Sequence, residues 1–155
     1  MENNPDIYTL QPVGRMLGLL GKSFLHLLNA KLHYLDIERN YYALLLIEHG
    51  ESNITQNELA RQLETDKVSI VRVIDYLGEK GYVNRVPSPT DKRKYCLTLT
   101  QKAIEALPGI KKAMKEVTET VFEGLSEAQK EVFYQTLDTI KHNLKKVNNH
   151  VSGHK

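Results

Sequence analysis

The sequence predicts a mostly α-helical fold of about six helices, interrupted by one small β-hairpin. Apolar residues recur at spacings of three and four through most of the chain. Two capping boxes, Thr55 with Glu58 and Ser126 with Gln129, mark helix starts. The exception is Gly81–Thr100, GYVNRVPSPTDKRKYCLTLT, in which two short alternating runs flank a basic turn rich in proline and serine. This stretch is expected to be the hairpin.

Length and composition favour one globular unit. The chain has 155 residues, 41% of them hydrophobic, and a net charge of +2, which is too small for a wholesale polyanion binder. Residues 61–100 nevertheless contain eight Lys/Arg and five Asp/Glu, a balance of +3 that leaves −1 for the rest. A single cysteine argues against a disulfide framework, and no signal peptide or long apolar run is evident. We therefore expect a cytoplasmic protein.

The first two helices are predicted from periodicity and end signals. Apolar residues at helical spacing predict a long helix over Val13–Leu35. Asp36 is expected to cap a second helix over Ile37–His49, and Gly50 to close it in the left-handed conformation.

Two short helices follow, joined by a tight turn. The capping box starts one at Thr55, with Ile54 packing on Leu59 as a hydrophobic staple. That helix breaks at Glu64 and Thr65, and Asp66 caps the next, which ends at Gly81. The pair is a helix-turn-helix candidate.

The second of these helices has two distinct faces. Its predicted buried residues are Ile70, Val73, Ile74 and Leu77. The opposite face and its N-terminal margin hold Lys67, Val68, Ser69, Val71, Arg72 and Asp75. In a DNA major groove the two valines would contact thymine methyls, and Arg72 a guanine edge or a phosphate. The alternative is that single β-branched residues lie on an ordinary surface.

Two further helices are predicted after the hairpin. Thr100 caps the fifth, which Pro108 and Gly109 kink or split, and the second capping box starts the sixth. Their apolar stripes are narrow, and they consist of Ala103, Leu107, Ile110, Met114, Val117 and Val121, then Phe133, Leu137, Ile140, Leu144, Val147 and Val151. Such stripes suit a seam between chains, with an intrachain bundle as the alternative.

The run LARQLETDKVSIVRVIDYLGEKGYVNRVPSPTDKRKYCLTLTQKA, Leu59–Ala103, resembles the winged helix-turn-helix of MarR-family (multiple antibiotic resistance) transcriptional regulators without a gap. The order of all six helices is also similar to that family. The resemblance implies a single unit over 1–155, with dimerisation helices at 10–35 and 100–151 and a winged DNA-binding region at 37–99. It also implies a homodimer that binds a pseudo-palindromic DNA operator as a repressor and is released by a small anionic or aromatic effector. The alternatives are a protein-interaction module and an effector-independent DNA-binding protein.

In the family, an aspartate and an arginine two residues apart mark the wing, here Asp91 and Arg93, and the preceding wing arginine falls on Arg85. Arg93 would enter a narrow minor groove while Asp91 holds one of the two arginines, and Lys92 and Lys94 would contact phosphates. The family often has serine or threonine where Val68 and Val71 stand, so an A·T-leaning contact is expected here. The expected DNA-contact residues are Thr55, Gln56, Asp66, Lys67, Val68, Ser69, Val71, Arg72, Arg85, Asp91, Lys92, Arg93 and Lys94.

Two further residue sets follow from the resemblance. The expected dimer interface comprises Val13, Leu17, Leu20, Met114, Val117, Phe133, Leu137, Ile140, Leu144 and Val147. The expected lining of an effector cleft comprises His26, His33, Tyr34, Tyr41 and Tyr42, with a buried aromatic core as the alternative.

Other chemistry is not supported. The six histidines form no His-x-x-x-His pair and no Cys/His cluster, so no metal site or other cofactor is predicted. Cys96 is interpreted as a packing thiol rather than a redox sensor. The sequence has no glycine-rich phosphate loop or nucleophile elbow, and an enzyme is not expected.

Overall fold

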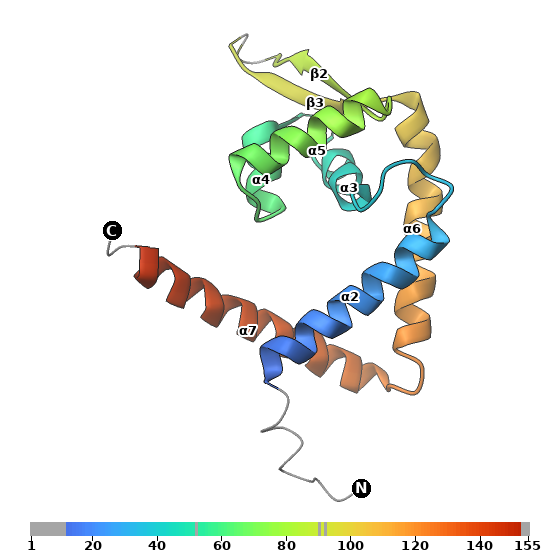
Figure 1. The fold of residues 1–155 in the computed structure, drawn as a ribbon, viewed down its shortest axis with the longest axis vertical. Coiled ribbons are helices and arrows are strands. Elements are labelled where there is room, and N and C mark those ends of the chain that lie inside the picture. Colours follow the sequence, from blue (N-terminus) through green and yellow to red (C-terminus); the bar gives the residue numbers. More distant parts are fainter. Residues whose placement is uncertain (1–11, 52, 90, 92, 153–155) are drawn as a thin grey trace, which may run out of the picture. The chain divides into compact units, whose positions relative to one another are not determined.

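The computed structural model describes residues 12–51, 53–89, 91 and 93–152. The predicted mostly α fold with one β-hairpin is confirmed (Figure 1). Its elements are α2 (Val13–Lys31), α3 (Tyr41–His49), β1 (Ile54–Thr55), α4 (Gln56–Gln62), α5 (Lys67–Glu79), β2 (Val83–Pro87), β3 (Tyr95–Leu99), α6 (Gln101–Val121) and α7 (Glu127–Ser152). The chain divides into two compact units, Met1–Val117 and Thr118–Lys155. No helix in the described ranges is long and apolar enough to cross a membrane.

Helix α2 ends four residues before the predicted Leu35. The Leu32 N–H makes the last helical bond, 3.0 Å to the carbonyl of Leu28, and the Leu35 N–H then bonds the Leu32 carbonyl at 2.9 Å. This tighter turn spans three residues rather than four. Leu35 therefore still packs against the core although the helix has ended, and apolar spacing alone placed the boundary too late.

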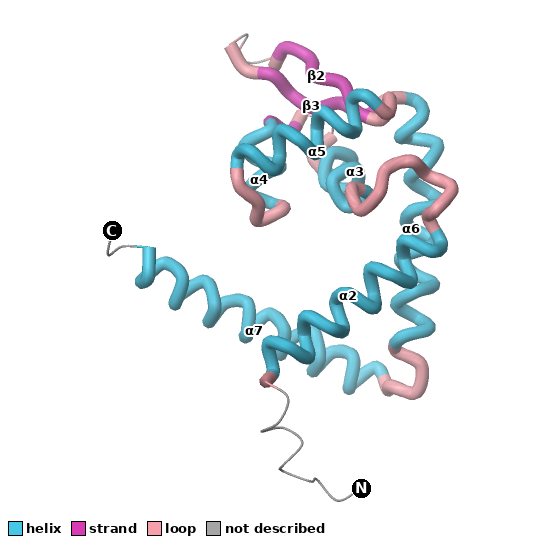
Figure 2. The backbone as a smooth tube through the Cα atoms, in the orientation of Figure 1, coloured by secondary structure: helices cyan, strands magenta, loops and turns pink. Residues whose placement is uncertain are grey.

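The predicted capping of a second helix by Asp36 is wrong. Helix α3 begins only at Tyr41, after a series of turns that Figure 2 shows as a loop beside α6. The Asp36 carboxylate instead accepts hydrogen bonds from the Tyr82 hydroxyl at 3.1 Å and Lys102 Nζ at 3.3 Å. These distant partners occupy the group that would otherwise have capped the helix.

Gly50 is also not in the left-handed conformation, because its φ is −77°. Glu51, with φ of 51°, adopts it instead. A Cβ at Gly50 would lie 3.1 Å from the Cβ of Ile54. The glycine is therefore explained by the close approach of Ile54.

The predicted ends of the helix-turn-helix are confirmed. Both halves of the capping box form, because Thr55 Oγ1 accepts from the Glu58 N–H and Glu58 accepts from the Thr55 N–H. Glu64 turns the chain with φ of 52°. Asp66 then caps α5 by accepting from the N–H groups of Val68 and Ser69 at 2.8 and 2.9 Å. Local sequence signals are sufficient here because each cap is satisfied within a few residues.

Helix α5 ends in a Schellman motif centred on Gly81. The Gly81 N–H bonds the Gly78 carbonyl at 2.9 Å, and the Tyr82 N–H bonds the Leu77 carbonyl at 2.8 Å. Gly81 has φ of +74°, which costs a residue with a Cβ considerably more. The motif turns the chain directly into β2.

The hairpin belongs to a three-stranded antiparallel sheet of order β1-β3-β2. Val83 pairs with Leu99 and Pro87 with Tyr95 in the hairpin, and β1 adds a pair between Ile54 and Leu97. The prediction missed β1 because two residues show no alternation. β3 is consequently the central strand, and its neighbouring residues Cys96 and Leu97 are both buried.

Helix α6 is capped by Thr100, as predicted, through a 3.3 Å bond from the Ala103 N–H. The helix continues through Pro108, so it is not split. At Gly109 a Cβ would lie 2.6 Å from the Tyr34 hydroxyl, so the glycine makes room for that side chain.

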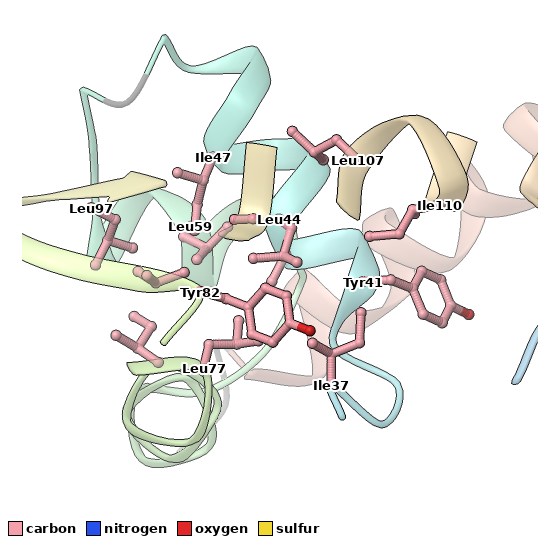
Figure 3. Packing of buried hydrophobic residues seen from close by; sticks show 14 of the residues in the cluster. Ile37, Tyr41, Leu44, Ile47, Leu59, Leu77, Tyr82, Leu97, Leu107 and Ile110 are labelled. Atoms are coloured by element: carbon pink, nitrogen blue, oxygen red, sulfur yellow. The ribbon is translucent and has the colours of Figure 1, made fainter. Parts of the chain in front are cut away.

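The core of the first unit joins α3, α4, α5, the sheet and α6. Figure 3 shows side chains from these elements pointing toward a common centre around Leu44. Ile70, Ile74 and Leu77 contribute the predicted buried face of α5 and are at most 1% exposed, with Val73 partly buried beside them. Helix α5 is thus held by one face, which leaves the opposite face outward.

The second unit contains the end of helix α6 and all of helix α7. Its predicted capping box is confirmed, with Gln129 Oε1 accepting from the Ser126 N–H at 2.8 Å. Phe122, Phe133 and Tyr134 form an aromatic cluster with ring centroids 5.4 to 5.8 Å apart. The rest of the helix exposes large apolar side chains, including Val132, Leu144 and Val147.

Candidate nucleic-acid interface

The outward face of α5 carries apolar side chains where an ordinary surface helix would carry polar ones. Val68 is 63% exposed and Val71 is 38% exposed, and Arg72 and Lys67 are exposed beside them. The same sequence pattern that buries Ile70 and Ile74 forces these residues outward. Helix α5 therefore presents methyl groups and cations together, as the sequence predicted.

The N-terminus of α5 is rigidly capped. Asp66 accepts a hydrogen bond from the Ser69 hydroxyl at 2.6 Å in addition to the two backbone bonds. These bonds, the Ser69 hydroxyl first and then its backbone N–H, lower the pKa of Asp66 below its usual value. Asp66 and Ser69 were both predicted to contact DNA. Because they bond to each other in the cap, they also stabilise the start of the helix.

The hairpin lies alongside α5 (Figure 1), and its two arginines have different carboxylate partners. Arg93 Nε lies 3.3 Å from Asp91 Oδ1, and Arg85 Nη2 lies 2.6 Å from Asp75 Oδ1. Asp91 also accepts from the Arg93 backbone N–H at 3.1 Å, and this bond followed by the side-chain bond lowers the pKa of Asp91. Of the two arginines expected for Asp91, the structure therefore gives it Arg93.

The hairpin cations and the start of α4 line one groove of about 570 Å³. Its lining residues are Thr55, Gln56, Asn57, Glu58, Arg85, Arg93, Lys94 and Tyr95. Five of these were predicted as DNA contacts, and the structure brings them together. Lys92 and Thr90 lie outside the described residues.

One predicted contact is altered by the capping box. The Thr55 backbone N–H already donates to Glu58 Oε2 at 2.8 Å, so it is not free to bind phosphate. That bond and the one from the Thr55 hydroxyl lower the pKa of Glu58 and keep it ionised. Gln56 and Lys94 are the groove residues for which the predicted phosphate contact is unaffected by the capping box.

Sequence reasoning missed Asp75 as the partner of Arg85, and Asn57 and Tyr95 as groove residues. Asp75 and Arg85 are ten residues apart and are separated by a helix end and a strand start. No periodicity connects such positions, so only the fold reveals the pair.

The five predicted effector residues do not share one cavity. His33 lines a cavity of about 470 Å³ with Asn29, Leu32, Leu35, Asp36, Glu38, Arg39, Asn40 and Tyr76. Tyr41 is 5% exposed and belongs to the core, as the alternative reading expected. Tyr34 and Tyr42 are largely exposed, and His26 is exposed on α2.

The predicted dimer residues fall into two groups. Val13, Leu20, Leu144 and Val147 are each more than half exposed, and Leu17 and Phe133 are more than a third exposed. Leu137 and Ile140 are partly buried. Val117, in contrast, is 3% exposed within the core of the chain, and Met114 packs partly against that core. Packing within the single chain therefore explains the burial of Val117 without a second chain.

Within the described ranges, no three His, Cys, Asp or Glu residues are grouped so as to hold a metal ion. Cys96 is buried in the central strand, a position that matches a packing thiol.

Comparison with known proteins identifies the family. The family model described as MarR family matches residues 37–94. The chain is 33% identical over 101 residues to the multiple antibiotic resistance protein MarR of Escherichia coli, covering 70% of that protein and 64% of this chain. The chain belongs to the MarR family. It is also 35% identical over 89 residues to a transcriptional regulatory protein for the hcr operon of Thauera aromatica, and it spans 54% of that protein's length.

Solved MarR-family structures share the fold over most of the chain. A crystal structure of MarR matches with a TM-score of 0.73 and 25% identity, covering 90% of this chain and 95% of that one. The transcriptional regulator SlyA has a TM-score of 0.81 at 21% identity, covering 90% and 99%. A MepR–DNA complex from S. aureus has a TM-score of 0.78 at 19% identity, covering 85% and 96%. The winged helix-turn-helix expected from the sequence is confirmed, and the chain is a MarR-family transcriptional regulator.

Proposed function

We propose that this chain is a homodimeric repressor that reads a pseudo-palindromic DNA operator. One observation carries the proposal: Arg85, which lines the cation-rich groove of the hairpin and α4, is bound to Asp75 of α5, the helix that carries the exposed valines. A methyl-bearing helix beside a basic hairpin supplies both major-groove readout and phosphate attraction. MepR, whose fold this chain shares, was solved in complex with DNA, which supports DNA as the partner.

Each part of the interface has a distinct role in the proposal. Val68 and Val71 contact thymine methyls, and Arg72 bonds a guanine edge or a phosphate. Arg93, held by Asp91, enters the minor groove, where a narrow A·T tract concentrates negative potential. Lys94, Gln56 and Lys67 contact phosphates, and Lys92 is assigned the same role from the sequence.

The dimer is formed in this proposal by residues 10–35 and 100–151, which include the exposed apolar side chains of α2 and α7. Two copies place their α5 helices in major grooves about one helical turn apart, roughly 34–36 Å. Residues 37–99 form the winged region that contacts DNA.

A small anionic or aromatic effector is proposed to bind the cavity beside His33 and Arg39. Two features support this choice: Arg39 supplies a cation, and the buried Oδ1 of Asn29 has no hydrogen-bond partner among the described residues. A ligand releases DNA only if it binds the DNA-incompatible arrangement more tightly. Isothermal titration should therefore show weaker effector binding in the presence of operator, and equal affinities would reject this mechanism.

Sequencing of DNA fragments selected by the purified protein tests the main proposal. A two-fold symmetric motif is expected, with affinity that falls steeply as salt rises, since counterions compete for the phosphates. By fluorescence anisotropy on the selected site, Arg93→Ala should weaken binding about tenfold or more. Lys112→Ala is the matched control, because it removes one exposed cation from α6, outside the winged region.

A protein-interaction module is the competing function. It would yield no enriched motif, and Arg93→Ala and Lys112→Ala would then behave alike on DNA. Either result would contradict operator binding.

A further inference from the structure

Asp36 lies in the turns between α2 and α3, and groups from other parts of the chain surround its carboxylate. The Tyr82 hydroxyl donates to Oδ1 at 3.1 Å, and Lys102 Nζ donates to the same oxygen at 3.3 Å. Lys80 Nζ lies 3.7 Å from Oδ2. One carboxylate thus joins the end of α5, the residue before β2 and the first turn of α6.

Further contacts close these interactions into a network. The Tyr76 hydroxyl donates to the Asp36 carbonyl at 3.0 Å, and Lys102 Nζ donates to the Lys80 carbonyl at 2.8 Å. Lys102 Nζ also lies 4.2 Å from the ring centroid of Tyr82, a cation–π distance. We call Asp36, Tyr76, Lys80, Tyr82 and Lys102 the Asp36 clasp. A single surface ion pair has little effect, whereas a network with several shared partners restrains geometry.

The electrostatics keep the clasp charged near neutral pH. Burial favours a higher pKa for Asp36, but hydrogen bonds from Tyr82 and Lys102 and the charge of Lys102 outweigh it, so the pKa is lowered. Burial and then the hydrogen bond to Asp36 raise the pKa of Tyr82 to about 12. The carboxylate is therefore an acceptor and the tyrosine a donor over the whole range in which DNA binding is measured.

The clasp contacts one end of α5 only. It holds the C-terminal end of this 13-residue helix, and Val68 and Val71 lie toward the other end. A helix of that length is about 20 Å long and rigid, so a small rotation at one end displaces the other end. The clasp also includes Asp36, which follows α2, and Lys102 of α6. Both helices belong to the regions proposed to form the dimer.

We propose that Asp36 is a positioning residue that fixes the direction of α5 relative to α2 and α6, and thereby the spacing of the two recognition helices on the operator. This inference rests on the proposed function. In this proposal Asp36 acts through Tyr76, Lys80 and Tyr82 rather than through contact with DNA.

Operator spacing tests the inference directly. Three versions of the selected operator are compared by fluorescence anisotropy: unchanged, with one base pair inserted at the dyad, and with one removed. The wild-type protein should lose affinity sharply on both altered sites. In Asp36→Asn, which removes the charge that Lys80 and Lys102 share, this loss should shrink by about threefold to tenfold.

Tyr82→Phe provides a second, milder variant, because it removes one hydroxyl and keeps the buried ring. Its spacing preference should weaken in the same direction as that of Asp36→Asn. The control is Glu105→Gln, in which the replaced carboxylate accepts from Gln101 of the same helix at 3.0 Å. This control should keep the wild-type preference.

The outcomes separate the two proposals. If the wild-type protein binds no operator, the proposed function fails. If it binds with a clear spacing preference that Asp36→Asn and Tyr82→Phe both retain, the positioning role is wrong. Equal weakening on all three sites would show that the clasp only stabilises the fold, and this too would overturn the inference. If Asp36→Asn does not fold, the Tyr82→Phe result decides.

Discussion

Arg93 and Arg85 belong to the same hairpin, but their side chains differ in exposure and in the carboxylate that binds them. The Arg93 side chain is 91% exposed although Asp91 holds its Nε, so its outer nitrogens remain available to a ligand. Arg85 is 40% exposed and is bound to Asp75 of α5 at 2.6 Å. Arg93 is therefore suited to enter a groove in DNA, and Arg85 to join the hairpin to the recognition helix.

Val71 provides the sharpest residue-level prediction. Val71→Ser removes two methyl groups from a side chain that is 38% exposed and lies outside the core cluster, so folding should be little affected. Binding to the selected operator should fall about threefold to tenfold, since apolar contact with thymine methyls is lost. The loss should be confined to A·T positions, as measured by anisotropy on operators with single base-pair changes.

Val73→Ser is an instructive comparison, because Val73 packs against the core from the same helix. It should lower thermal stability, whereas Val71→Ser should not. Unchanged affinity and base preference in Val71→Ser at every operator position would refute the methyl contact.

At the level of elements, the sequence predicted those boundaries whose signals are local. The caps at Thr55, Asp66 and Ser126 are each satisfied within three residues, so their residue types identify them. The boundary at Asp36 was mispredicted because its partners Tyr82 and Lys102 are 46 and 66 residues away. Strand β1 was missed for a related reason: its pairing with β3 exists only after folding.

The same reasoning applies to the candidate interface. The outward residues of α5 followed from helical periodicity, because each lies opposite a predicted buried residue. The bond between Arg85 and Asp75 and the meeting of Thr55, Arg85 and Lys94 in one groove could not be read from the sequence, because they require the sheet to be in place.

The Schellman motif between α5 and β2 makes a prediction about stability. Gly81→Ala should lower the free energy of unfolding by about 1–2 kcal/mol, because φ of +74° strains any residue with a Cβ. Gly78→Ala, three residues earlier within α5, should instead be neutral or stabilising by up to about 1 kcal/mol. Chemical denaturation of both variants measures the difference.

The room available for a Cβ does not explain the expected difference in stability between the two variants. A Cβ at Gly81 would have no atom within 4 Å, and one at Gly78 would meet its nearest atom, the Val83 carbonyl oxygen, at 3.7 Å. If Gly81→Ala proved as stable as Gly78→Ala, backbone conformation would not be the reason for glycine at this turn.

For the whole molecule, the exposed apolar residues of α2 and α7 lead to a prediction of how stability depends on protein concentration. If two chains fold as a dimer, each tenfold increase in protein concentration should raise Tm by about 2–4 °C. Leu144→Glu, at a side chain 57% exposed in the single chain, should weaken this dependence without disturbing the described core. Sedimentation should show the corresponding shift toward monomer, and a concentration-independent Tm with a monomeric wild type would contradict the dimer.

The same exposed stripe on α7 has a consequence for gene dosage. If only paired chains span both half-sites, then at low expression the amount of competent repressor rises with the square of the number of chains made. A twofold change in synthesis would then alter operator occupancy about fourfold before saturation. The apolar residues that leave a single chain incomplete would thus make the regulatory response steep without any cooperative contact between neighbouring operators.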